Sequence, residues 1–229
     1  MGKVVPFRPR GSATSAPTDE TTSFEGPSRI HTRDWASSFT LSVAWLAERS
    51  STPSLVRGEG TILLRGMTND AGGQPIVRSH GVGQMSVVKA CLATGEDLEA
   101  AFTAESERHA QLAEDVFDRY RFSEEFETWC EEEHGQHPLE DPLFLVDLRL
   151  DRDVLDDLAG DRAKTHAVPL DEWVAAMAAI DALAVLGAVG SPFVAFGHAT
   201  RSHAPRSWLE ALNAKPWRPD LFVGFRPDP

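Results

Sequence analysis

Hydrophobic residues along the first third of the chain are spaced with two different periods. Residues 34–46 carry large apolar side chains at helical spacings, which predicts an amphipathic helix with Asp34 near its N-cap. The apolar run at residues 61–64 stands between two glycines and predicts a short buried strand. Residues 76–77 predict a second short strand, which leads into a helix at residues 84–92.

A helical spacing dominates the middle of the chain. One long helix is predicted from residues that recur at intervals of three, four and their multiples, namely Leu98, Phe102, Leu112, Val116 and Tyr120. Ser123 then predicts the N-cap of a second helix, because a serine side chain can accept a hydrogen bond from the first turn. Gly135 predicts the C-terminal end of that helix.

Alternation typical of a strand is clearest at residues 142–150, where every second residue is apolar. Asp153 predicts the cap of a short helix that Gly160 ends. Residues 170–186 are rich in alanine and predict a closely packed helix. The remaining predicted elements are a strand at 192–196, a helix at 205–213 and a strand at 221–225.

Together these elements predict an α+β or irregular α/β fold that is predominantly helical and has a few short strands. Residues 1–29 are rich in Pro, Gly, Ser and Thr and poor in large apolar side chains, which predicts a disordered basic tail. Residues 30–229 are then expected to form a single globular domain, since this length suits one hydrophobic core.

Acidic residues are concentrated in one block of the chain, residues 94–161. This block holds 22 Asp or Glu against five Arg, a net charge of −17. The whole chain has a net charge of −13, so the remaining residues sum to +4. A dense negative surface repels nucleic acid and anionic membranes and attracts basic partners or cations. Direct nucleic-acid binding is therefore not expected.

The acidic block predicts a non-catalytic interaction protein that binds a basic protein partner through a helical face. Trp129 is the candidate apolar anchor of that face, because buried aromatic residues supply most of the affinity at interfaces. Glu131, Glu132 and Glu133 are the candidate rim charges. The alternative is that this face is simply solvated.

A metal site is a second candidate within the same block. Cys130, His134 and His137 form a C-x3-H-x2-H group, and cysteine and histidine are the usual ligands of zinc. The common four-ligand spacing is absent, and the helix dipole alone explains a histidine at position 134. We therefore expect no cofactor, with zinc as the alternative.

A basic loop near the C-terminus is a candidate anion site. Arg201, His203 and Arg206 lie in it, and these side chains can bind phosphate or a carboxylate. The alternative is a solvated loop that offsets part of the acidic surface.

Two short motifs suggest further chemistry. Asp151 and Asp153 follow the clearest strand and resemble the first motif of haloacid-dehalogenase-type phosphatases, in which such aspartates act as nucleophile and acid. The match covers about five residues and departs at Leu155, where that family has threonine. Gly81 and Gly83 precede a predicted helix and could present backbone N–H groups to an anion.

Two rival functions remain open at this stage. A nucleic-acid mimic would display carboxylates at phosphate-like spacing and occupy a nucleic-acid-binding protein. A metal-assisted hydrolase would use the histidine-containing loops.

The expected location is the cytoplasm. Two cysteines without CxxC spacing are typical of a reducing compartment. The N-terminus lacks the apolar core of a secretory signal. The most apolar run, residues 173–190, contains Asp181 and predicts a buried helix and no membrane span.

Overall fold

The computed structural model describes residues 35–49, 52–69, 72–105, 107–187, 191–196, 209, 213–219 and 221–225. The predicted tail at residues 1–29 lies outside the described residues, as does most of the predicted helix at 205–213.

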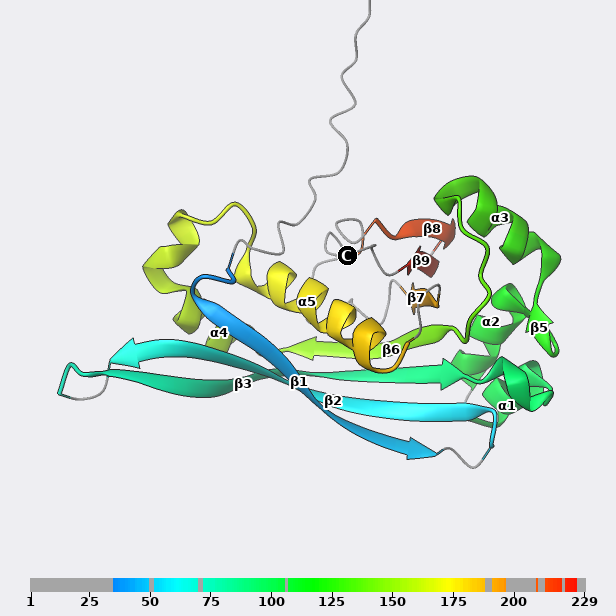
Figure 1. The fold of residues 1–229 in the computed structure, drawn as a ribbon, viewed down its shortest axis with the longest axis horizontal. Helices are drawn as coiled ribbons and strands as arrows, with labels where there is room; N and C mark the ends of the chain where they lie inside the picture. Colours follow the sequence, from blue (N-terminus) through cyan, green and yellow to red (C-terminus); the bar gives the residue numbers. More distant parts are fainter. Residues whose placement is uncertain are drawn as a thin grey trace, which may run out of the picture.

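Seven strands form one sheet in the order β1-β2-β3-β6-β7-β9-β8 (Figure 1). Their bounds are β1 Phe39–Arg49, β2 Leu55–Asn69, β3 Pro75–Ala90, β6 Leu143–Leu150, β7 Pro192–Phe196, β8 Lys215–Arg218 and β9 Leu221–Phe225. Neighbouring strands are antiparallel except β6 and β7, which are parallel. A parallel pair needs a crossover connection, and the chain between β6 and β7 contains helices α4 and α5.

Helices lie at both ends of the sheet and across one of its faces (Figure 1). Their bounds are α1 Leu98–Glu105, α2 Glu107–Val116, α3 Glu124–His134, α4 Arg152–Ala159 and α5 Leu170–Val185, with short 3-10 turns η1 Leu92–Thr94 and η2 Gly160–Lys164. A small hairpin of β4 Phe117–Asp118 and β5 Arg121–Phe122 joins α2 to α3. We call residues 96–134, which contain α1, α2, this hairpin and α3, the helical end, and β1–β3 the meander.

The prediction of a predominantly helical fold is wrong, although α+β is compatible with the structure. Strands make up 40% and helices 36% of the structure. Residues 34–46 were expected to be helical, but β1 occupies most of them, and β3 occupies residues 84–90 of the helix expected at 84–92. In β1 the large apolar residues also alternate with small ones, which is the period of two typical of a strand. Pairing with β2 stabilises this extended conformation.

The single long helix predicted between Leu98 and Tyr120 is also wrong. The structure divides it into α1 and α2, and Tyr120 lies on the turn of the β4–β5 hairpin with its side chain 52% exposed. The predicted caps of α3 are confirmed. The Ser123 side chain accepts a hydrogen bond from the backbone N–H of Phe126 (3.2 Å), and Gly135 ends the helix at a φ of 64°.

Several other predicted elements are found close to their expected positions. The strands at 142–150, 192–196 and 221–225 correspond to β6, β7 and β9. The N-cap of α4 is two residues earlier than predicted, because Asp151 rather than Asp153 accepts the hydrogen bond from the first turn.

The helix α5 supplies much of the hydrophobic core. Nine of its residues are buried, which agrees with the predicted close packing of residues 170–186. None of the helices in the described part of the chain combines the length and apolar character needed to span a membrane.

The face of the meander opposite α5 is open. Along β1, Thr40, Ser42, Ala44 and Leu46 are exposed on this face, while the residues between them turn toward the core. Figure 1 shows α5 on one side of the meander and no described helix on the other.

Candidate functional site

Acidic residues gather at the helical end. Residues 96–134 contain 14 Asp or Glu and three Arg, a net charge of 3 − 14 = −11. The α1, α2 and α3 helices lie together at one end of the sheet, whereas α4 lies at the other (Figure 1). The acidic block of the sequence is therefore divided in space, and the helical end carries most of its charge.

The helix α3 distributes its predicted partner-binding residues over different flanks. Because successive residues of a helix are about 100° apart, Glu132 and Glu133 lie on the flank of Trp129 and Glu131 lies on another. Glu125 shares the flank of Trp129 and Glu132, at one turn from Trp129. The three consecutive glutamates do not form one patch.

Basic side chains next to the helical end contact two of these carboxylates. Glu131 is 2.8 Å from Nδ1 of His137, and Glu133 is 3.3 Å from Nζ of Lys215. Glu132 forms no ion pair with another described residue. The same holds for three further exposed carboxylates, those of Glu114, Asp118 and Glu124.

Trp129 is half-buried and belongs to an aromatic cluster. Its ring centroid is 5.1 Å from that of Trp217 on β8 and 6.4 Å from that of the fully buried Phe126. The guanidinium of Arg218 lies 4.2 Å from the centroid of Trp217, and it contacts the carboxylates of Asp115 (3.4 Å) and Glu125 (3.1 Å). Arginine is thus held between an aromatic face and two carboxylates.

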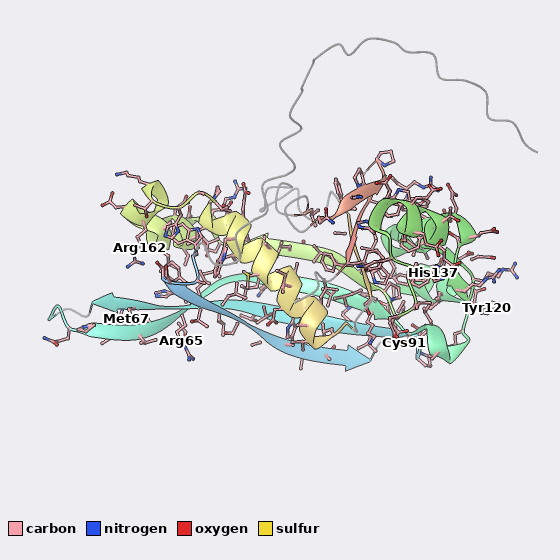
Figure 2. The ribbon with its side chains drawn as sticks, turned by 45° about the horizontal axis from the view of Figure 1, so that its top comes forward. Arg65, Met67, Cys91, Tyr120, His137 and Arg162 are labelled. Atoms are coloured by element: carbon pink, nitrogen blue, oxygen red, sulfur yellow. The ribbon has the colours of Figure 1, made fainter. Side chains whose placement is uncertain are left out.

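Tyr120 is the exposed aromatic side chain of the helical end, at 52% exposure (Figure 2). It lies on the hairpin turn beside Arg119, whose φ is 55°. Backbone hydrogen bonds join the turn to α1, because the carbonyl of Arg119 accepts from the N–H of Leu98 (2.7 Å). Sequence reasoning placed Tyr120 on a buried stripe and missed this position. The only signal against the stripe is its interruption at residues 121–122.

The candidate metal residues differ in environment. Cys130 is fully buried, and burial raises the pKa of its thiol to about 12, with a further rise from the nearby charge of Glu127. This disfavours the thiolate that a metal ligand requires. His134 packs between Trp129 and Phe225, and His137 pairs with Glu131 at the surface. Across the part of the chain that the structure describes, no three His, Cys, Asp or Glu side chains are grouped to hold a metal ion.

An open pocket of about 660 Å³ brings together two motifs that lie far apart in the sequence. Gly81 and Gly83 of β3 line one part of it, and Asp151, Arg152 and Asp153 line another. The Asp151 side chain is engaged in capping α4. Gly81 and Gly83 lie inside a strand and do not precede a helix, so the predicted backbone anion site at a helix N-terminus is wrong.

The predicted anion loop of Arg201, His203 and Arg206 lies outside the described residues. Comparisons of the chain with protein-family models, with curated proteins and with solved structures found no match.

Proposed function

We propose that this protein is a non-catalytic binding protein whose helical end docks a basic protein partner. The observation that carries the proposal is the net charge of −11 at that end, together with exposed carboxylates that form no ion pair with another described residue. Such a surface speeds the encounter with a positively charged protein through long-range attraction.

Affinity in this proposal comes from aromatic side chains beside the carboxylates. Tyr120 is exposed and held on a short hairpin, so it can be buried on binding without loss of much conformational freedom. Trp129 and Glu132 share one flank of α3 and form the second contact. The packing of Arg218 on Trp217 between two carboxylates supports arginine as the side chain that the partner presents.

We place this function in the cytoplasm. Cys91 and Cys130 are both free thiols, which is consistent with a reducing compartment.

Charge reversal at the two ends of the molecule tests the proposal. The variant Glu124→Lys with Glu132→Lys changes the helical end, and Asp156→Lys with Asp157→Lys changes α4 by the same net charge at exposed positions. Both variants and the wild-type chain would be used to capture proteins from nuclease-treated and untreated lysates at low and high salt. The captured partner is then purified and its affinity for each variant is measured.

We expect one basic protein to bind the wild type and the α4 variant, and to bind the helical-end variant at least tenfold more weakly. Tyr120→Ala should weaken binding without changing its salt dependence, because it removes apolar contact and leaves the charge intact. Equal losses of affinity in both charge variants would mean that only the net charge of the protein matters, and would contradict a defined binding site at the helical end. A partner that competes with nucleic acid for the helical end would favour the nucleic-acid mimic.

A further inference from the structure

The strand β1 is an edge strand of unusual length. It has 11 residues, and all of them pair with β2 in an unbroken antiparallel register from Phe39↔Gly66 to Arg49↔Val56. Within the described residues, no strand pairs with its other side. Every second residue of an antiparallel edge strand directs its N–H and C=O groups away from the neighbour, so β1 presents a regular row of main-chain donors and acceptors.

The β1 edge lacks the features that normally prevent strand addition. Residues 39–47 contain no charged residue and no proline, and the pairing with β2 has no bulge. Natural edge strands are usually short, bulged, or marked by lysine, proline or an inward charge. An edge without these features is a template for another strand.

Exposed apolar side chains lie beside this edge on both faces of the sheet. On the open face, Leu46 is 60% exposed. On the other face, Asp181 of α5 accepts a hydrogen bond from the indole of Trp45 (2.9 Å), so this flank of α5 is directed toward β1. Val185 lies one turn further on the same flank and is 57% exposed.

We infer that β1 pairs antiparallel with β1 of a second copy of this chain and joins the two sheets into one. A two-fold axis at Ala44 would set Leu46 of one copy against Ser42 of the other and Glu48 against Thr40, so no like charges would be opposed. A parallel in-register pair would place Glu48 beside Glu48, and like charges directly opposite each other are destabilising.

The charge distribution of the whole chain also favours the antiparallel arrangement. The Arg49 end of β1 lies toward the helical end, since the adjoining β2 residue Arg57 forms an ion pair with Glu105 of α1 (2.9 Å). The Phe39 end lies toward η2, where the guanidinium of Arg162 packs over the ring of Phe39. Antiparallel pairing places the helical end of one copy, with a net charge of −11, beside residues 151–164 of the other copy, whose net charge is only −2. The two strongly acidic helical ends are then kept apart.

Sedimentation equilibrium of the full-length chain over a range of concentrations tests the inference. We expect the wild type to reach twice the mass of the chain. Leu46→Lys and Ala44→Lys each place a lysine on the exposed face of the edge strand, and each should raise the dissociation constant at least tenfold. Met67→Lys is the matched control, because Met67 is 62% exposed but lies near the far end of the meander on β2 (Figure 2), and it should remain dimeric.

Hydrogen exchange locates the contact in the same samples. Amides of β1 should become more protected as protein concentration rises, while amides of the other edge strand, β8, should not change. Circular dichroism of each lysine variant shows whether the chain is still folded. A wild type that stays monomeric at every concentration overturns the inference, whatever covers the edge. A dimer that both edge variants leave intact overturns it as well.

Discussion

The two edges of the sheet are built differently. At one edge, β1 is 11 residues long, regular and uncharged over residues 39–47. At the other, β8 has four residues, which include Lys215, Pro216 and Arg218, and its pairing with β9 shifts register between Pro216 and Arg218. Short length, proline, cations and a bulge all discourage strand addition. The comparison indicates that β1 is suited to main-chain hydrogen bonding with another strand, whereas the β8 side is suited to contacts through side chains.

The layers behind the two edges differ in the same way. Behind β8, all five residues of β9 are buried and the aromatic cluster of α3 covers the strands. In the meander, Gly60 and Gly66 leave room for the side chains of Val43, Trp45 and Phe39, Gly83 lies against the main chain of β6, and one face stays open. The β8 side should therefore depend on aromatic packing for its stability, and the meander on glycine positions where a larger residue would not fit.

Removal of an aromatic ring from the β8 side should have the largest effect. Phe126 is fully buried against Phe122, Trp129 and Trp217. Phe126→Ala should lower the free energy of unfolding by about 3–5 kcal/mol, because it removes buried apolar surface and leaves a cavity. Met67→Ala, at an exposed apolar position of the meander, should change it by no more than about 0.5 kcal/mol. Denaturant titration of both variants measures the difference, and similar losses would contradict the comparison.

A methyl group added to the meander should have the next largest effect. A Cβ at Gly83 would overlap the Arg149 carbonyl oxygen on β6 and lie 2.8 Å from Cδ2 of Leu150, whereas a Cβ at Gly81 would meet no atom within 4 Å. Gly83→Ala should lower the free energy of unfolding by about 1–3 kcal/mol, since backbone atoms have to move.

Gly81→Ala is the matched control, two residues away on the same strand. It should leave the free energy of unfolding unchanged or raise it by about 0.4–1 kcal/mol, because alanine restricts the unfolded chain. Equal losses in the two variants would mean that the meander needs flexible glycine rather than the space at Gly83.

The elements that sequence predicts well are those specified by local signals. The strand β6 and the helix α3 are recognisable from alternation within a few residues and from the caps Ser123 and Gly135. The strand β1 was missed, and β3 was predicted only at residues 76–77, because their open face carries polar and small residues and their conformation depends on pairing with distant segments. The strand β8 gave no signal because Pro216 interrupts a run of four residues.

The candidate site could be predicted only in its charge. The acidic excess is visible in composition, and it does lie largely on neighbouring helices. The ion pair between Glu133 and Lys215 joins residues 82 positions apart, so no local sequence pattern predicts it. The exposure of Tyr120 depends on the turn between β4 and β5, which the helical spacing of the sequence does not predict.

The smallest expected effect is a dependence of stability on pH. It arises on the β8 side from one half-buried side chain, that of His134. Burial lowers the pKa of His134 below its usual 6.5, and the charge of Lys215 lowers it further. A hydrogen bond with the backbone of Val223 and the charge of Glu133 act in the opposite direction. The Nε2 atom of His134 is buried and has no hydrogen-bond partner in the described part of the chain, so a proton added there would not be stabilised.

A histidine whose pKa is lower in the folded state binds protons preferentially in the unfolded state. The stabilising effect of neutral His134 is therefore complete above pH 6.5 and is lost as pH falls from 6.5 toward the lower pKa of the folded state. Denaturant titrations at several pH values between 7.5 and 5.5 should show this loss in the wild type. In His134→Gln, whose side chain does not titrate, the loss should be smaller over the same interval. Identical pH profiles for the two proteins would mean that the titrating group is not His134. The two sides of the sheet would then not differ in pH sensitivity through this residue.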